Sequence, residues 1–295
     1  RAKRSNLPDS NEAHTLWAIT EPEIKQELSQ FLSSQPLYIA DGHHRYETAL
    51  AYQQERAQIS HEQVPSPLTG EGQGEGEGEE AKRSLAGKEA FNYVMLELVD
   101  FSDPGLVVLP IHRLVRGIAP STLAELEKQL ENFFALEFFS LSEDSLASSE
   151  SKPFALSVFA SEAKQSHKSQ NIVLGVLGLR AGTLVLLKRR QDISLEALMP
   201  ANKSEAYREF DVSILNHIIL DKVLSGAKGL DVAYTVDLKE AYQQIKEGKY
   251  QLAFLLNPPQ AEMVKAVADA QDRMPSKSTY FYPKLPAGLI INPFD

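Results

Sequence analysis

The sequence contains no cysteine and only one tryptophan among its 295 residues. Without cysteine the chain can form neither a disulfide bond nor a thiolate metal site, and we expect a reducing, cytoplasmic compartment. It also lacks any apolar run close to the roughly 18 to 20 residues that a membrane helix requires. We therefore expect no membrane partner.

Positive charge is in deficit, because 30 Lys and Arg face 40 Asp and Glu and give a net charge of −10. A chain this acidic is not expected to bind DNA through bulk charge. With 43% hydrophobic residues, the length suffices for one large core or two modest ones. A homo-oligomer is compatible with this composition.

The chain opens "RAKRSNLPDS", with neither an initiator methionine nor an apolar signal segment. We interpret it as a fragment of a longer protein, so part of an active site would lie outside this sequence.

Strands and helices alternate along the chain, which predicts an α/β or mixed α+β fold. Thr20 and Glu23 have the spacing of a capping box and predict a helix start. Phe91, Val94, Met95 and Leu98 predict the core stripe of a helix. Helices are expected at 21–32, 43–57, 88–98, 120–134, 204–226, 237–247 and 260–271, and strands at 15–19, 37–40, 106–109, 250–259 and as a pair within 172–188.

Two regions are expected, residues 1–118 and 119–295, packed together as one unit. Glycine and glutamate alternate without an apolar period in "GEGQGEGEGEE", which predicts a disordered insert at about 60–86. A second, shorter insert is expected at about 161–170.

The most informative stretch is "LYIADGHHRYETAL", residues 37–50. Gly42 suits a tight turn between an apolar run and a helix. A helix that begins near His43 directs free N–H groups and a positive dipole end at whatever lies in front of it. Arg45 adds a planar fork of donors for a phosphate or carboxylate. These features predict an anion-binding turn with Asp41, His43, His44 and Arg45 as candidate catalytic residues.

Other interpretations of this stretch stay open. His43 and Glu47 lie four apart on one helical face and, with Asp41, would supply metal ligands. Alternatively Asp41 caps the helix and the histidines are surface or satisfied core groups.

Two further polar clusters are candidates for substrate binding. His112 and Arg113 follow the break at Pro110, although a surface salt bridge of Arg113 would explain them equally. Lys277, Ser278 and Thr279 lie in a segment predicted to be extended, which a solvated edge strand would also explain. Asn257-Pro258 ends a buried strand, where ligand-facing residues often collect.

The motifs "YIADGHHRYETAL", "DPGLVVLPIHRLV", "FDVSILNHIIL", "AFLLNPP" and "MPSKSTYFYPKLPAGLI" occur in this order. They resemble a bacterial and archaeal family catalogued as domain of unknown function 1015, whose members are longer at the N-terminus. The turn is also similar to the phosphate-binding turn of the ParB/sulfiredoxin superfamily, which includes kinases of free serine that use ADP or ATP. This resemblance implies a ParB/sulfiredoxin-like nucleotide-binding core plus a second mixed-sheet region. It also implies that Gly42, His43 and Arg45 hold phosphate and that Asp41 and His44 complete the motif.

The resulting hypothesis is a nucleotide-dependent small-molecule kinase that phosphorylates the hydroxyl of free serine or a similar acceptor. It would use ATP or ADP with Mg²⁺ beside Asp41, and Lys277 or Arg113 would bind the carboxylate of the acceptor. In the serine kinases a general-base glutamate lies upstream of the motif. Glu21, Glu23 and Glu27 precede the motif here, and the counterpart is either one of them or a residue of an N-terminal part outside this sequence. The alternatives are a non-catalytic ParB-like nucleotide-binding regulatory protein and a metal-dependent hydrolase.

Overall fold

The computed structural model divides the chain into two compact units, residues 1–39 and residues 40–295. The insert predicted at about 161–170 lies outside the described residues, as does nearly all of the one predicted at about 60–86. The structure describes residues 3–6, 13–62, 89–141, 173–194, 197–226, 229–284 and 290–291.

The first unit consists of a short hairpin and one helix. Strands β1 (Lys3–Asn6) and β2 (Ala13–Leu16) pair antiparallel, and helix α1 spans Pro22–Ser33. The predicted capping box of Thr20 and Glu23 is wrong, because the N-cap is Glu21 and no side chain caps the helix. Pro22 occupies the first helical position, where its fixed φ favours a helix start and its missing N–H costs nothing.

The second unit is built on a six-stranded sheet with strand order β5-β7-β6-β9-β4-β8. Every ladder in it is antiparallel. Helices pack against this sheet, and the two together confirm the predicted mixed α/β class. The strands are β4 His112–Arg116, β5 Phe134–Ser140, β6 Val173–Leu177, β7 Thr183–Arg189, β8 Asp231–Thr235 and β9 Leu252–Leu255.

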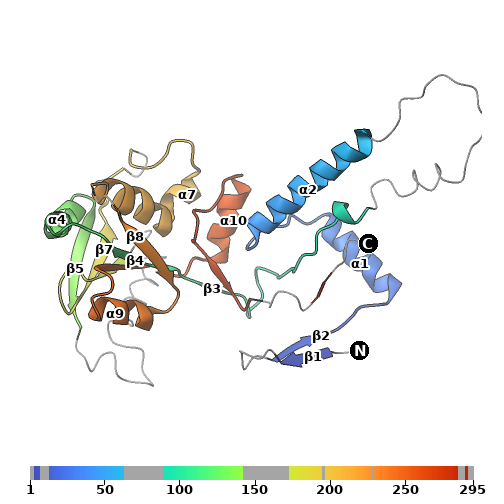
Figure 1. Ribbon diagram of the computed structural model, residues 1–295, viewed down its shortest axis with the longest axis horizontal. Coiled ribbons are helices and arrows are strands. Elements are labelled where there is room, and N and C mark those ends of the chain that lie inside the picture. Colours follow the sequence, from blue (N-terminus) through green and yellow to red (C-terminus); the bar gives the residue numbers. More distant parts are fainter. Residues whose placement is uncertain are drawn as a thin grey trace, which may run out of the picture. The chain divides into compact units, whose positions relative to one another are not determined.

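Helices cover both faces of this sheet (Figure 1). Neighbouring residues of a strand point to opposite faces, so Val115 packs with helices α4, α8 and η2 while Leu114 packs with α9. Each large apolar side chain buried in this way contributes roughly 1.5 to 3 kcal/mol to folding. The helices are α4 Pro120–Glu131, α7 Glu205–Glu209, α8 Asp211–Ile214, the π-helix η2 Leu215–Val223, α9 Leu238–Lys246 and α10 Ala261–Asp269.

The predicted regions 1–118 and 119–295 share this sheet. Strand β4 ends at Arg116, yet it pairs with β8 on one side and β9 on the other. The boundary at residue 118 itself stays a prediction. The strand pair predicted within 172–188 is confirmed as β6 and β7, and the buried strand within 250–259 is confirmed as β9.

The helix predicted at 88–98 is wrong. Only a 3₁₀ turn, η1 (Ala90–Asn92), forms there, and residues 93–100 have no regular structure. Val94, Met95 and Leu98 are at least 43% exposed, so the expected stripe is not part of the core. An isolated helix of this length is marginal in water and needs an apolar surface on which to pack.

Two predicted strands also differ. The strand predicted at 37–40 is wrong, because these residues take part in no ladder within the described ranges. The strand predicted at 106–109 exists as β3 (Val107–Leu109), but it is only partly buried and pairs with β10 (Tyr280–Tyr282) in a separate two-stranded sheet.

The helical region predicted at 204–226 is confirmed, with two departures from regular α-helix. Phe210 has an extended backbone that separates α7 from α8. The following turns have π geometry, and the N–H of Leu224 donates to the carbonyl of Ile219, 2.8 Å away and five residues back. Such π segments are rare and often accompany functional sites. Among the described helices, none combines the length and apolar character needed to cross a bilayer.

Candidate functional site

The turn that the sequence predicts to bind an anion lies at the start of helix α2 (His43–Glu62). Gly42 has a φ of 80°, a left-handed conformation that glycine adopts without strain. Its carbonyl accepts the first helical hydrogen bond, from the N–H of Tyr46 at 3.0 Å. The preceding N–H groups at the helix start have no acceptor within the helix and carry the positive end of its dipole. The backbone therefore provides the predicted donors.

Arg45 folds back over Gly42. A Cβ atom added to Gly42 would lie 3.1 Å from Nη2 and 3.2 Å from Nε of Arg45. Any larger residue would push the guanidinium away, besides being strained at this φ. Glycine is thus required here both by the turn and by the arginine that covers it.

Asp41 interacts with two cations, Lys284 and Arg45. Its Oδ1 accepts the N–H of Gly42 at 2.9 Å, and its Oδ2 lies 3.1 Å from Nζ of Lys284. Partial burial raises the pKa of Asp41, but Lys284, the Gly42 N–H and Arg45 lower it more, so the pKa is below its usual value. The carboxylate is ionised at neutral pH.

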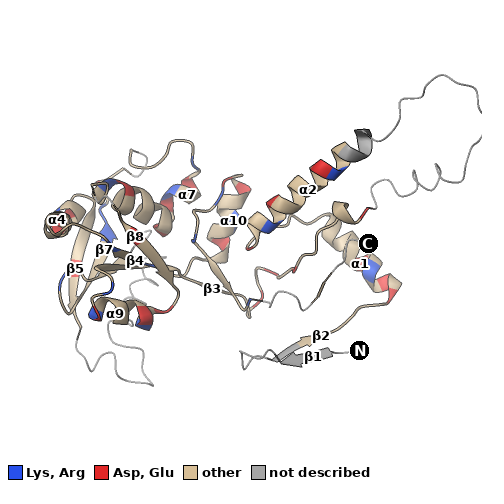
Figure 2. Ribbon diagram, viewed as in Figure 1, with Lys and Arg blue, Asp and Glu red and all other residues tan. Residues whose placement is uncertain are grey.

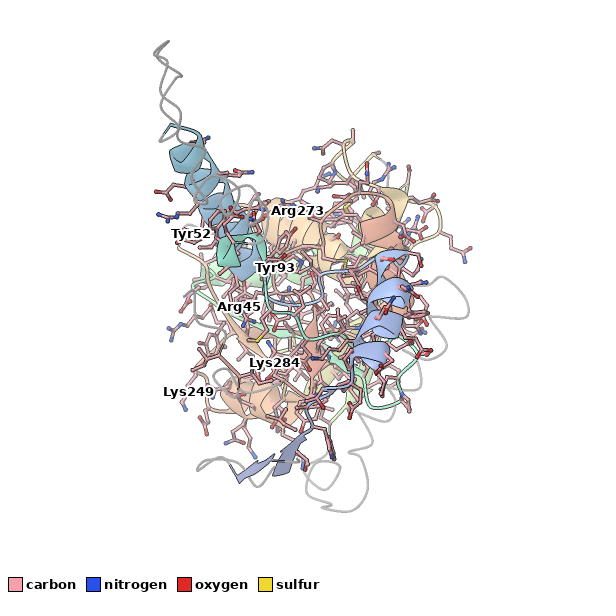
Figure 3. The ribbon with its side chains drawn as sticks, turned by 90° about the vertical axis from the view of Figure 1, so that its right-hand side faces the viewer. Arg45, Tyr52, Tyr93, Lys249, Arg273 and Lys284 are labelled. Carbon is pink, nitrogen blue, oxygen red and sulfur yellow. The ribbon has the colours of Figure 1, made fainter. Side chains whose placement is uncertain are left out.

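Lys284 was not among the candidates, although it belongs to the last of the ordered motifs. Its Nζ lies 4.5 Å from the ring centroid of Tyr280, a cation–π contact. Tyr280 is itself fixed by β10, where it pairs with Leu109 of β3. Figure 3 labels Lys284 and Arg45, the two cations of the turn. Nothing in the local sequence places position 284 beside position 41.

Glu47 is held one turn into α2 by other partners. Its Oε1 lies 2.9 Å from Nη1 of Arg273, and its Oε2 lies 3.5 Å from Nδ1 of His44. Within the described part of the chain, no group of three or more His, Cys, Asp or Glu side chains is placed to hold a metal ion. The three-ligand metal site of Asp41, His43 and Glu47 therefore does not form.

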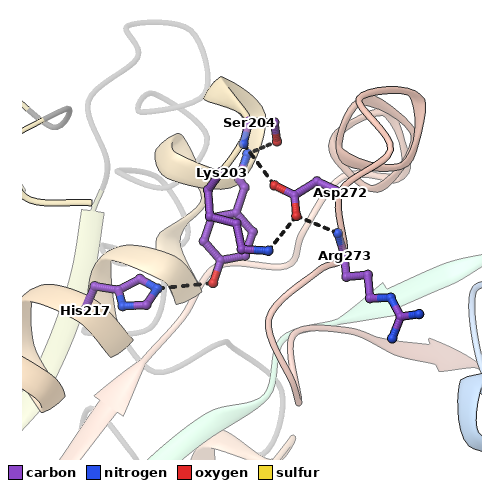
Figure 4. A network of polar contacts seen from close by, with 6 residues as sticks. Lys203, Ser204, His217, Asp272 and Arg273 are labelled. Carbon is purple, nitrogen blue, oxygen red and sulfur yellow. Dashed lines mark hydrogen bonds and ion pairs between the residues drawn. The ribbon is translucent and has the colours of Figure 1, made fainter. Parts of the chain in front are cut away.

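Arg273 follows a strongly bonded aspartate (Figure 4). Asp272 accepts hydrogen bonds from Nζ of Lys203 at 2.6 Å, from the N–H of Ser204 at 2.9 Å and from the N–H of Arg273 at 2.8 Å. Burial raises the pKa of Asp272, but these bonds outweigh it and bring the pKa to about 2. Asp272 thus fixes the backbone from which Arg273 reaches α2.

A further polar chain adjoins this network and was missed from the sequence. The ammonium of Lys203 lies 4.6 Å from the ring centroid of Tyr207, whose hydroxyl is 3.1 Å from Nε2 of His217. Nδ1 of His217 lies 3.3 Å from Oδ2 of Asp221. The four-residue spacing of His217 and Asp221 was the available signal.

His112 is buried and neutral. Its Nδ1 accepts the N–H of Leu256 at 3.1 Å, so the proton sits on Nε2. Burial, and then the charge of Arg113, lower the pKa of His112 to about 4, while Asp237 opposes them.

Arg113 points to the other face of the sheet and is also buried, with 2% of its surface exposed. It donates to the carbonyls of Ile111, Ser276 and Lys277, the last at 2.8 Å, and lies over the Tyr234 ring. Burial lowers its pKa to about 10. The surface salt bridge considered for Arg113 is therefore wrong, and its contacts hold the turn at 276–277.

The three residues of the cluster at 277–279 differ in their exposure to solvent. Lys277 has a φ of 57° and an exposed side chain, whereas Ser278 is buried and donates its hydroxyl to the carbonyl of Pro275. Thr279 is partly exposed. In the described part of the chain, no hydrogen bond or ion pair joins His112 or Arg113 to residues 41–47. Substrate binding by these residues stays a prediction.

Asn257 and Asp211, which belong to two different motifs, contact each other beyond the end of β9. Nδ2 of Asn257 donates to Oδ2 of Asp211 at 3.2 Å. Burial raises the pKa of Asp211 to about 7, although this hydrogen bond lowers it in part. Leu256, which binds His112, is the neighbour of Asn257. The structure therefore brings "FDVSILNHIIL", "AFLLNPP" and "PIHRLV" to one place.

Charge is mixed on the helices around these sites. Both signs occur on each of α2, α9 and α10 (Figure 2), so these helices present no continuous basic stripe of the kind that tracks nucleic-acid phosphates.

The protein is therefore a mixed α/β protein in which a left-handed glycine precedes a long helix and two cations, Arg45 and Lys284, lie at the start of that helix. Residues 4–213 match the family described as "Protein of unknown function (DUF1015)", and the chain belongs to this family. The family predicted from the ordered motifs is thus confirmed. The relationship to the ParB/sulfiredoxin superfamily stays a prediction.

No curated protein matches the sequence. Among solved structures, a conserved hypothetical protein from Pyrococcus furiosus is similar at 15% identity and a TM-score of 0.33, covering 63% of this chain and 60% of its own. A free serine kinase in complex with AMP is similar at 14% identity and a TM-score of 0.33, covering 63% and 57%. The chain thus spans less than two thirds of the length of either protein.

Proposed function

We propose that the chain binds ATP or ADP at the Asp41–Arg45 turn and is a nucleotide-dependent kinase of a small molecule, with free serine or a similar hydroxyl compound as acceptor. The observation that carries the proposal is the arrangement of Arg45 over a left-handed Gly42 at the start of a long helix. Phosphate groups bind readily at such helix starts, where free N–H groups and the dipole favour negative charge.

Each residue of the turn has a defined task in this proposal. The helix N–H groups and the planar fork of Arg45 bind phosphate oxygens and stabilise the charge that develops during phosphoryl transfer. His43 and His44 supply proton donors or acceptors beside the phosphates. Lys277, whose side chain is exposed, is the candidate for the acceptor carboxylate.

The turn also fits Mg²⁺. Mg²⁺ is usually held by one or two carboxylates together with substrate phosphates, and Asp41 offers one ionised carboxylate that is 54% exposed. Mg²⁺ would neutralise phosphate charge there. The acceptor hydroxyl additionally needs a general base, for which the turn offers the two histidines.

Phosphorus NMR tests the proposal. The chain is incubated with ATP or ADP, Mg²⁺ and L-serine, beside Arg45→Ala and the control Arg56→Ala, which removes an exposed arginine further along the same helix. We expect a new phosphomonoester signal that persists in the control and falls about 100-fold or more in Arg45→Ala.

Three other outcomes would contradict parts of this proposal. Full turnover in Arg45→Ala would remove the turn from the active site. Inorganic phosphate without phosphoserine would indicate hydrolysis. Nucleotide binding without any turnover would favour the regulatory protein over the kinase.

A further inference from the structure

Positive charge exceeds negative charge at the α2 turn. Arg45 and Lys284 both act on the single carboxylate of Asp41, which leaves one uncompensated positive charge before the helix dipole is counted. The whole chain, by contrast, carries a net charge of −10. A local surplus of this kind in an acidic protein favours an anion.

The Lys284–Asp41 pair is open to exchange. The two side chains are 45% and 54% exposed, and ion pairs exposed to this extent contribute only about 0 to 1 kcal/mol. A second anion therefore has little to overcome in displacing the carboxylate. A polyphosphate carries more charge than a carboxylate and offers more acceptor oxygens.

Lysine suits such an exchange better than arginine does. Its ammonium is a point charge with three rotatable donors on a flexible stem, whereas a guanidinium is a fixed planar fork. The Tyr280 ring, 4.5 Å from Nζ, keeps the ammonium of Lys284 beside the turn whichever anion it binds. Because β10 and β3 fix Tyr280, the reach of Lys284 is limited to this neighbourhood.

We propose that Lys284 is an anion-binding residue of the turn, which exchanges the Asp41 carboxylate for a phosphate oxygen of the nucleotide. This inference rests on the proposed nucleotide site and deepens it. The exchange would also leave Asp41 Oδ2 available to hold Mg²⁺, which would neutralise phosphate charge there.

Two other cations of the second unit are less suited to this role. Arg113 is buried and donates to backbone carbonyls. Arg273 is paired with Glu47 on the next helical turn. Lys284 is the cation whose charged atom lies beside the turn and whose present partner is a residue of the turn itself.

Calorimetric titration of the chain with ADP in the presence of EDTA tests the exchange without divalent metal. We expect Lys284→Met to weaken ADP binding about tenfold or more, and Lys284→Arg to retain part of the affinity. Lys265→Met is the matched control, since Lys265 is 48% exposed and lies 2.7 Å from Asp269. It should bind ADP as the unaltered chain does.

Asp41→Asn provides a second test in the same ADP titration. If Asp41 competes with phosphate for Lys284, this variant binds ADP several-fold more tightly in EDTA, because the competing charge is gone. Circular dichroism of every variant checks that the fold is retained.

Three results would overturn the inference: unchanged ADP affinity in Lys284→Met, weaker metal-free binding in Asp41→Asn, or no ADP binding by the unaltered chain. The kinase proposal fails separately. If ADP binds with the expected pattern but no phosphomonoester forms, Lys284 keeps its role and the kinase proposal is wrong. If phosphoserine forms while Lys284→Met binds ADP normally, the kinase proposal stands and the role of Lys284 is wrong.

Discussion

Nη1 of Arg273 lies 2.9 Å from Oε1 of Glu47, a contact between residues 226 positions apart in the sequence. It joins the first turns of α2 to the segment that follows α10. A second ion pair, from Lys284 to Asp41, joins the same segment to the turn itself. The site thus depends on two exposed ion pairs that come from one stretch of chain.

Exposed ion pairs predict weak, salt-dependent coupling. Glu47 and Arg273 are 44% and 84% exposed, so a double-mutant cycle with Glu47→Gln and Arg273→Gln should give a coupling energy below about 1 kcal/mol. Raising the salt concentration should reduce it further. Urea unfolding of the four proteins at low and high salt measures this. A large, salt-insensitive coupling would mean that the pair is buried.

Gly42→Ala should cost both stability and anion binding. A left-handed φ costs an alanine roughly 1 to 2 kcal/mol, and its Cβ would press on Arg45. Gly182→Ala is the matched control, because Gly182 has a φ of 62° and nothing within 4 Å of an added Cβ. Both variants should lose similar stability in urea, but only Gly42→Ala should lose ADP affinity. Equal affinities would mean that the position of Arg45 is irrelevant to binding.

Asp272 should contribute stability that disappears in acid. Its pKa is about 2 in the folded chain and near 3.8 when unfolded. The contribution is therefore complete above about pH 4 and is lost as the pH falls towards 2. Allowing for solvent screening, we expect about 1 to 2 kcal/mol.

Acid unfolding of Asp272→Asn and of Asp192→Asn checks this prediction. Asp192 is a suitable control because it pairs with Arg190 on the surface, where its side chain is 66% exposed. The acid-dependent loss should vanish in Asp272→Asn and persist in Asp192→Asn. Identical acid profiles for the two variants would contradict the role of Asp272.

His112 should make the fold less stable below neutral pH. Its pKa falls from 6.5 to about 4 on folding, so between these values the unfolded chain binds a proton that the folded chain does not. Stability contributed by this group therefore decreases as the pH falls through that window, by up to about 1.4 kcal/mol per pH unit. His112→Asn, whose amide oxygen can accept the Leu256 N–H, should remove this slope.

Asp211 changes the pH dependence of folding stability in the direction opposite to His112, over much of the same pH range. Its folded pKa of about 7 lies above the ordinary 3.8, so its contribution decreases as the pH rises. Asp211→Asn is therefore the companion to His112→Asn. Urea midpoints from pH 4 to 7 should gain a steeper slope in Asp211→Asn and a flatter or inverted one in His112→Asn. A shared direction of change would refute both assignments.

The turn at Asp41–Arg45 could be predicted because its parts are neighbours in the sequence. A glycine between an apolar run and a helix start defines its own backbone, and Arg45 reaches Gly42 within that turn. Lys284 and Arg273 could not be predicted in the same way, because only tertiary structure brings them to α2.

Elements with a strong local pattern were also predictable, whereas those decided by packing were not. Strands β6 and β7 are predictable because they are continuous apolar runs on either side of a tight turn, a pattern typical of strands buried on both faces. Strand β5 was missed because Phe138 and Phe139 are apolar on both faces, which obscures its alternation. Residues 88–98 show the opposite case, in which a helix is predicted but does not form. Their apolar side chains have helical spacing, but most of them are exposed and they pack on no core.

The segment after η1 has a practical consequence for work on this protein. Its apolar side chains are between 43% and 59% exposed in the folded chain: Tyr93, Val94, Met95, Leu96, Leu98 and Val99. Dyes such as ANS, which fluoresce on exposed apolar surface and commonly report molten states, have a binding surface here without any unfolding. Dye emission from a fresh preparation would therefore not distinguish the folded chain from a damaged or partly folded one, and melting curves should be followed by circular dichroism instead.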